Sequence, residues 1–172
     1  MSGPRAAYTI AHEQFEGQVI PNPSGRAKKP EAPRLDPRGQ SGLVSIIVPT
    51  YNRGYCVNKS IESALAQTYR DIEVIVVDDG STDNTREVVA AAFGDEARVT
   101  YVYQSNGGVA VARNRGIRLA RGEFIALLDS DDIWKPWKTE MQVKVLQERP
   151  EVGMVWTDME AVNPEGQLIA PR

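Results

Sequence analysis

The chain has 172 residues, of which 41% are hydrophobic and 25% are charged. This composition is typical of one soluble globular domain with a buried core, and it excludes a disordered or fibrous chain. The net charge is only −3 and Lys and Arg are scattered along the sequence, so we expect no nucleic-acid partner.

The first 42 residues are rich in proline. Six of the eleven prolines lie before residue 40, and apolar residues show almost no periodicity there. Such a composition is typical of flexible or partly extended chain. We therefore predict a flexible, proline-rich arm over residues 1–42 and a folded domain over residues 43–172.

Short apolar runs rich in β-branched residues recur along the folded part, which is typical of strands. These runs cover residues 44–49, 73–78, 99–103, 123–129 and 152–158. Helices are predicted between them, from the fourfold spacing of Val57, Ile61 and Leu65, from capping residues before 86–93, and from Gly122 after 114–120. This alternation predicts an α/β, Rossmann-like fold with a mainly parallel sheet and helices on both faces.

The first four predicted strands end in small, polar or acidic residues: "PTYNR", "DDGSTD", "QSNGG" and "DSDD". In open α/β sheets, ligands bind beyond the carboxyl ends of the strands. Five aspartates could therefore converge on one crevice: Asp78, Asp79, Asp129, Asp131 and Asp132. Any one of them could instead cap the next helix, which is the interpretation we prefer for Asp83.

The stretch "FIALLDSDDIW" places three carboxylates within four positions after an apolar run. Two carboxylates about 4 Å apart repel by roughly 4 kcal/mol at an effective dielectric near 20, so the cluster needs water, protons or a cation. The only histidine, His12, lies in the arm, which excludes histidine-based catalysis and histidine-ligated zinc in the folded part. Aspartates select Mg²⁺ or Mn²⁺, and Mg²⁺ fills its other positions with water and phosphates.

Other motifs are missing from the sequence. It contains neither GxxxxGK[ST] nor G-x-G-x-x-G, so neither a P-loop NTPase nor a dinucleotide dehydrogenase is indicated. Cys56 is the only cysteine, no apolar run approaches 18 residues, and the first residues contain no hydrophobic signal core. We therefore expect a cytoplasmic protein without a transmembrane segment, one that could also work peripherally at a membrane surface.

Three stretches together resemble family 2 glycosyltransferases of the GT-A fold, over residues 43 to about 160. They are "VSIIVPTYNR", "SIESALAQTYRDIEVIVVDDGSTDNT" and "NGGVAVARNRGIRLARGEFIALLDSDD". The resemblance implies transfer of a sugar from a nucleoside-diphosphate sugar, usually a UDP-sugar, with inversion at the anomeric carbon. It implies an acceptor hydroxyl on a carbohydrate, a lipid-linked molecule or a protein, and it matches the family's D-x-D motif to Asp129-Ser130-Asp131.

The resemblance also implies roles for residues in the donor site. Asp131 is expected to bind the Mn²⁺ or Mg²⁺ that bridges the two phosphates, and Asp129 to contact the ribose or sugar. Pro49 and Tyr51 are expected beside the base, where Tyr51 could stack on the ring. Asp78 is expected to accept a hydrogen bond from the uracil imide, with Asp79 as its neighbour.

The remaining motif residues have less specific roles. Gly107 and Gly108 would let the backbone approach the donor. Arg113 and Asn114 could face either the phosphates or the sheet edge. Asp132 could hold the loop, and we expect Trp134 and Trp137 to form core or wall.

The resemblance places the general base in a later segment, beyond Arg172, and no matched motif makes Asp158 that base. Three alternatives remain open: a complete glycosyltransferase, a fragment that binds donor but turns over poorly, and a non-catalytic nucleotide-sugar-binding module. A sugar nucleotidyltransferase is disfavoured because "PTYNRGY" contains a single glycine. We expect a domain truncated at its C-terminus, with uncovered apolar surface around residues 152–157.

Overall fold

The computed structural model describes residues 8–11, 19–21, 39–163 and 166–169. Most of the predicted flexible arm, including His12, lies outside these residues. Within the arm, β1 (Tyr8–Ala11) and β2 (Val19–Pro21) are strands. The central sheet also begins inside the predicted arm, because β3 spans Gln40–Thr50.

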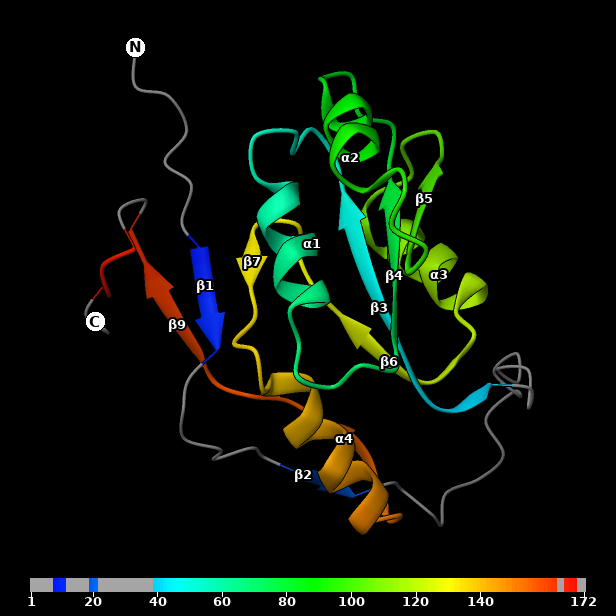
Figure 1. Ribbon diagram of the computed structural model, residues 1–172, viewed down its shortest axis with the longest axis vertical. Coiled ribbons are helices and arrows are strands. Elements are labelled where there is room, and N and C mark those ends of the chain that lie inside the picture. The colour runs from blue at the N-terminus through cyan, green and yellow to red at the C-terminus, as the bar shows by residue number, and fades with distance from the viewer. Residues whose placement is uncertain (1–7, 12–18, 22–38, 164–165, 170–172) are drawn as a thin grey trace.

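Four parallel strands form the central sheet, in the order β5-β4-β3-β6 (Figure 1). The neighbours of β3 are β4 (Ile72–Asp78) and β6 (Gly122–Leu127), and β5 (Val99–Tyr103) lies at one edge. The register pairs Thr50 with Asp78 and Asp78 with Tyr103, while Ile47 pairs with Leu127. The carboxyl ends of all four strands therefore lie at one edge of the sheet.

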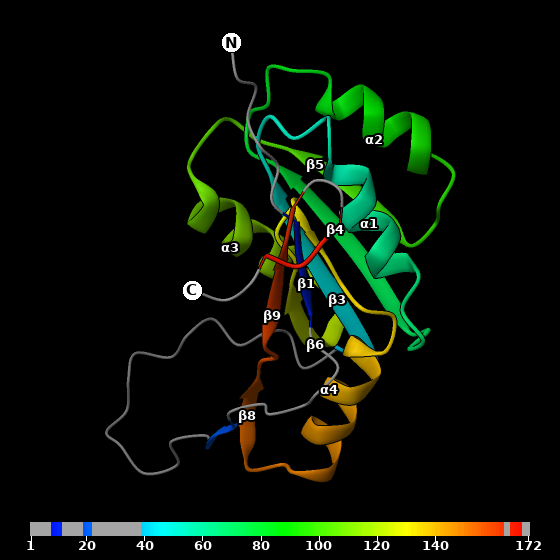
Figure 2. The same ribbon diagram turned by 90° about the vertical axis from the view of Figure 1, so that its left-hand side faces the viewer.

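Helices cover both faces of this sheet, as predicted. α1 (Val57–Leu65) and α2 (Thr85–Phe93) lie on one face, and α3 (Val109–Leu119) lies on the other (Figure 2). The main core lies under α1 and α2, where Ile46 and Val76 of the sheet are fully buried. A smaller cluster of Ile75, Val77 and Ala112 lies under α3.

The chain beyond β6 adds short strands and one more helix. β7 (Asp132–Ile133) and β9 (Met159–Val162) both pair with β1, and β8 (Val152–Val155) pairs with β2. The strand predicted over residues 152–158 is wrong in length, because β8 ends at Val155. The helix α4 (Lys138–Glu148), which has Val143 as its one buried aliphatic residue, was not predicted from the sequence.

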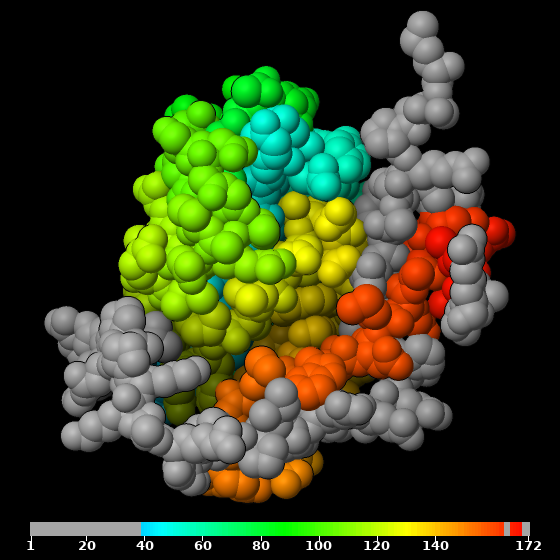
Figure 3. All heavy atoms as spheres, turned by 180° about the vertical axis from the view of Figure 1, so that it is seen from behind, coloured from blue at the N-terminus to red at the C-terminus, as the bar shows by residue number. Residues whose placement is uncertain are grey.

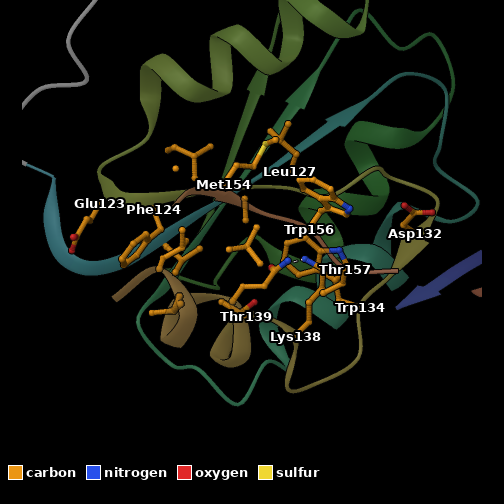
Figure 4. A pocket seen from close by; sticks show the side chains of 18 of the residues that line it. Glu123, Phe124, Leu127, Asp132, Trp134, Lys138, Thr139, Met154, Trp156 and Thr157 are labelled. Atoms are coloured by element: carbon orange, nitrogen blue, oxygen red, sulfur yellow. Dashed lines mark hydrogen bonds between the residues drawn. The ribbon is translucent and has the colours of Figure 1, made fainter. Parts of the chain in front are cut away.

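A largely apolar cavity of about 630 Å³ lies between β6, α4 and β8 (Figure 4). Trp134 lines it, and the Lys138 ammonium lies 3.9 Å from the centre of the Trp134 ring and donates to Gln142 Oε1 at 2.8 Å. Burial lowers the pKa of Lys138 to about 8. Leu127 and Met154 are also part of the lining and are about half exposed. Within the segment expected to be uncovered, residues 152–157, Met154 is exposed, whereas Val152 is buried and Val155 and Trp156 are half-buried.

Close packing of α3 on β3 depends on Gly116, because a Cβ atom added there would lie 2.4 Å from Ile47 Cγ2. Overpacking by the added methyl group should cost about 2–3 kcal/mol, the upper part of the usual range, because the approach to Ile47 is so short. After the roughly 1 kcal/mol that alanine gains over glycine in helix propensity is subtracted, we predict that Gly116→Ala destabilises the fold by about 1–2 kcal/mol. Urea unfolding measures the change, and Asn114→Ala, at an exposed position of the same helix, is the control. A Gly116→Ala variant as stable as the wild type would contradict this account of the contact.

Candidate functional site

A second cavity, of about 640 Å³, lies at the carboxyl edge of the sheet. The loops after β3, β4 and β6 and the start of α3 contribute to its wall. Seven of the eight residues predicted for the donor and metal site line it: Pro49, Tyr51, Asp79, Gly108, Arg113, Asp129 and Asp131. Figure 3 shows this face of the molecule, with α3 in yellow-green beside the yellow segment after β6 and the cyan loop after β3 next to both.

Asp78 is the predicted site residue that does not line the cavity. Its side chain is fully buried, and its Oδ1 accepts a hydrogen bond from the Ser81 backbone N–H at 2.7 Å. Its Oδ2 accepts a hydrogen bond from the Tyr101 hydroxyl, and burial together with this bond raises the pKa of Tyr101. Contact between Asp78 and a uracil ring stays a prediction, since Asp78 is fully buried and does not line the cavity.

Asp79 lines the cavity and organises the loop that follows β5. Its Oδ1 accepts hydrogen bonds from Gln104 Nε2 at 2.7 Å and Gly107 N at 2.9 Å, and its Oδ2 accepts one from Gly108 N at 2.7 Å. Burial alone would raise the pKa of Asp79, but these three donors outweigh it and lower the pKa below its ordinary value. Gly108 adopts φ +87°, a conformation that favours glycine, and no atom lies within 4 Å of a Cβ added there. The loop therefore presents bare backbone to the cavity.

The loop after β3 reverses at Asn52, which has φ 52° and is the one non-glycine residue with positive φ in the described part of the chain. Asparagine tolerates this conformation because its short polar side chain can form local hydrogen bonds. Here Asn52 Oδ1 accepts from Thr82 N at 2.8 Å and Asp83 N at 3.3 Å, and Asn52 N donates to Ser81 Oγ at 2.8 Å. These bonds attach the loop after β3 to the loop after β4.

Two further backbone donors continue this attachment. Arg53 N donates to Thr85 Oγ1 at 3.0 Å, and Gly54 N donates to Asp83 Oδ2 at 3.1 Å. Asp83 also accepts from Thr85 N at 3.0 Å at the start of α2, although the N-cap residue of this helix is Asn84 and not Asp83 as preferred from the sequence. The residues on either side of Asn52, Tyr51 and Arg53, both line the cavity.

Each aspartate of the D-x-D motif lies beside an arginine. Arg113 Nη2 is 2.6 Å from Asp129 Oδ1, and Arg53 Nη2 is 3.7 Å from Asp131 Oδ2. Arg53 was not among the predicted site residues, and its place directly after "PTYN" is the one sequence signal that could have marked it. Asn114 is exposed and does not line the cavity.

Asp132 directly follows the motif, but it lines the apolar cavity between β6, α4 and β8 and not the cavity at the carboxyl edge of the sheet. Its backbone N–H donates to the Asp129 carbonyl at 3.0 Å, which closes a turn over the motif. This turn is consistent with the predicted role of Asp132 in holding the loop. The D-x-D segment thus separates the two cavities, with Asp129 and Asp131 on one side and Asp132 on the other.

The donor set fits a hard cation that arrives with phosphate ligands. Within the part of the chain that the structure describes, no group of three or more His, Cys, Asp or Glu side chains could enclose a metal ion. Asp129 and Asp131 are 49% and 40% exposed at their side chains and line the same cavity. One or two carboxylates are what Mg²⁺ uses when phosphates and water supply its other ligands.

Two buried polar atoms of the cavity wall have no hydrogen-bond partner, Thr50 Oγ1 and Arg113 Nε. Thr50 is only 3% exposed. Leaving a buried polar atom unpaired costs about 1–3 kcal/mol, so these two atoms are candidate contacts for a molecule bound in the cavity.

No helix among the described residues is both long enough and apolar enough to cross a membrane.

Sequence comparison finds similarity to sugar-transferring proteins. The family model described as Glycosyl transferase family 2 matches residues 45–168. A chondroitin synthase of Pasteurella multocida (strain Pm70) is 41% identical over 128 residues, which are 74% of this chain and 13% of that protein. The glycosyltransferase GlyG of Streptococcus pneumoniae is 46% identical over 110 residues, which are 63% of this chain and 36% of that protein. The chain therefore spans about a third or less of these relatives.

Comparison with solved structures also finds similar proteins. TarS 1–349 of S. aureus, solved in complex with UDP-GlcNAc, superposes with a TM-score of 0.58 at 30% identity, over 63% of this chain and 32% of that one. The mannosyltransferase PcManGT of Pyrobaculum calidifontis, solved with GDP-Man and Mn²⁺, gives a TM-score of 0.56 at 31% identity, over 74% of this chain and 34% of that one.

We predict that Asp79→Asn destabilises the protein by about 1.5–3 kcal/mol at pH 7, the range for hydrogen bonds to a charged group. Because folding lowers the pKa of Asp79, its stabilisation is present above the ordinary carboxyl pKa and is lost as the pH falls through the folded value. The stability difference between wild type and variant should therefore shrink below about pH 4.

Urea unfolding of both proteins at several pH values measures this difference. Asp95→Asn, at an exposed position after α2, is the matched control and should have little effect. A difference between wild type and Asp79→Asn that stays constant from pH 7 to pH 3 would contradict the role given to the Asp79 charge.

Proposed function

Because this chain belongs to glycosyl transferase family 2 and has the GT-A fold of its structural neighbours, we propose that it binds a UDP-sugar with Mn²⁺ or Mg²⁺ and transfers the sugar, with inversion, to an acceptor hydroxyl. The observation that carries the proposal is the position of the D-x-D motif. Asp129 and Asp131 line the same cavity as Tyr51 and Asp79, although the sequence separates them by 50 residues or more.

The nucleotide base would bind between the loops after β3 and β4. Tyr51 is 47% exposed and lines the cavity next to Pro49, so its ring is available for stacking. Asp79 lines the cavity and retains acceptor capacity, because a carboxylate offers about four lone-pair sites and three are used. Recognition of the uracil imide by Asp78, in contrast, would require the buried 78–81 turn to open.

The diphosphate would lie between the arginines and the D-x-D motif. Arg113 has an unpaired Nε in the cavity wall, and its planar guanidinium suits phosphate oxygens. Asp131 would hold the divalent cation and Asp129 would contact the ribose or sugar. The bound cation would supply electrostatic stabilisation of the departing nucleotide diphosphate. The bare backbone at Gly108 would let the donor approach the start of α3.

A general base for the acceptor hydroxyl is assigned to no residue of this chain. The three carboxylates that line the cavity all have partners: Asp79 accepts three N–H groups, and Asp129 and Asp131 face arginines. This observation favours a second candidate function, a module that binds the nucleotide sugar without transferring the sugar. Acceptor-stimulated UDP release distinguishes the two functions, because only the complete transferase would show it.

We predict that UDP binds in the presence of Mn²⁺ or Mg²⁺ and that EDTA largely abolishes binding. Asp131→Asn should have the same effect as EDTA, because it removes the carboxylate that would hold the cation. Isothermal titration calorimetry measures both, with GDP in place of UDP as a test of the base preference. Asp158→Asn, at an exposed position outside the donor cavity, is the control. Equal UDP affinity with and without metal would contradict the assignment of Asp131.

Thr50→Val should weaken UDP binding without lowering the stability of the fold, because valine has nearly the shape of threonine but no hydroxyl. The Thr50 Oγ1 atom has no partner in the ligand-free protein, so its removal should leave stability unchanged or raise it by up to about 1 kcal/mol. If the ligand supplies the missing partner, UDP should bind about 0.5–1.5 kcal/mol more weakly, the net value of one hydrogen bond. Thermal unfolding and calorimetry measure the two effects, and a loss of stability with unchanged UDP affinity would contradict this role.

A further inference from the structure

The charged side chains at the mouth of the donor cavity neutralise one another. Arg53 and Arg113 contribute two positive charges, and they face Asp131 and Asp129, which contribute two negative charges. The third carboxylate, Asp79, accepts three N–H groups and keeps its negative charge. The two ion pairs therefore balance each other, and Asp79 leaves the cavity lining with one excess negative charge.

The two ion pairs differ in how firmly they are held. Arg113 Nη2 and Asp129 Oδ1 are 2.6 Å apart, a short charge-assisted hydrogen bond. Arg53 Nη2 and Asp131 Oδ2 are 3.7 Å apart, which is longer than a hydrogen bond, and both side chains are about 40% exposed. Asp131 is thus the aspartate of the motif whose present partner is the easier to replace.

Arg53 has a fixed backbone and a movable side chain. The backbone N–H groups of Asn52, Arg53 and Gly54 all donate to side chains of residues 81–85, so the loop is attached at three consecutive positions. Among the described residues the Arg53 guanidinium makes no hydrogen bond, and it lies 5.9 Å from the centre of the Tyr55 ring. Its side chain can therefore change partners within the cavity without movement of the loop.

This arrangement makes each ligand a poor binder by itself. A divalent cation that enters alone must displace Arg53 from Asp131 and leave a guanidinium beside a dication. A diphosphate that enters alone must approach two carboxylates. When both enter, Asp131 would hold the cation and the Arg53 guanidinium would bind phosphate oxygens, for which its planar donors are well suited.

We propose that Arg53 is the counter-cation of Asp131 in the ligand-free protein, and that its transfer from Asp131 to the diphosphate couples binding of the divalent cation to binding of the nucleotide. This inference rests on the proposed function, since it takes Asp131 as the cation ligand and a nucleoside diphosphate as the partner. It adds a positioning residue that the sequence motifs did not identify.

The affinity for Mn²⁺ with and without UDP tests the inference, and electron paramagnetic resonance of free Mn²⁺ measures it without any turnover. In the wild type, UDP should tighten Mn²⁺ binding by roughly 5- to 150-fold, the usual range for coupled sites. In Arg53→Gln, Mn²⁺ alone should bind about two- to fivefold more tightly than in the wild type, which corresponds to the loss of an exposed ion pair. UDP should then tighten Mn²⁺ binding by a smaller factor.

Two further variants serve as controls. Arg53→Lys keeps the positive charge and should keep the weak wild-type affinity for Mn²⁺ alone. Arg118→Gln removes one positive charge from an exposed position of α3 outside the cavity and should leave both Mn²⁺ affinities unchanged. Thermal unfolding of each variant establishes that it folds, and the backbone donors of residue 53 are the same in all of them.

The outcomes separate the inference from the proposed function. If wild-type UDP binding requires Mn²⁺ but Arg53→Gln has wild-type affinity for Mn²⁺ alone, the inference is wrong and the proposed function stands. If the wild type binds UDP equally well with and without Mn²⁺, or binds no Mn²⁺ in any form, both are wrong. Tighter Mn²⁺ binding in Arg53→Gln, with unchanged affinity in Arg53→Lys, supports the inference.

Discussion

Hydrogen bonds between β3 and its two parallel neighbours hold the ends of distant chain segments at one cavity. Thr50 lies opposite Asp78 across the β3–β4 pair, and Leu128 N donates to the Ile47 carbonyl at 3.0 Å just beyond the β3–β6 pair. A shift of one residue in either register would exchange buried and cavity-facing side chains. The positions of the motif carboxylates thus depend first on the register of the sheet and only then on the conformation of the loops.

The loops add a second level of order through side chains that accept backbone N–H groups. Asn52 and Asp83 connect the loop after β3 to the loop after β4, and Asp79 organises the loop after β5. Each such residue is a short polar side chain in a loop after a strand, where backbone donors have no sheet partner. The same carboxylate or amide can therefore shape the cavity wall and be part of it.

Much of this arrangement could be predicted from the sequence, because apolar runs define the strands and acidic or small residues mark their ends. The different environments of Asp78 and Asp79 could not be predicted. Successive residues at the end of a strand point to opposite sides, so both aspartates are buried but only Asp79 lines the cavity. Which of the two does so depends on the neighbours that bind them, Tyr101 and Gln104, and both come from or follow β5.

The Arg53 pair and α4 illustrate a different reason for incomplete prediction. Arg53 meets Asp131 across 78 positions of sequence, and the contact depends on the reversed backbone at Asn52, for which an asparagine in a loop is only a weak signal. In α4, Val143 is the one buried aliphatic residue, so the helical pattern of apolar residues is faint. In both cases tertiary packing decides what the local sequence leaves open.

Gly116 packs so closely on Ile47 that the residue sizes tolerated at these two positions depend on each other. A relative with alanine or serine at the position of Gly116 would need a smaller residue, such as valine or alanine, opposite it on β3. Otherwise α3 would move outward, and Arg113, less than one helical turn away, would move away from Asp129 with it. A conventional stabilisation of this domain by replacing helix glycines should therefore pass over position 116, or change it only together with position 47.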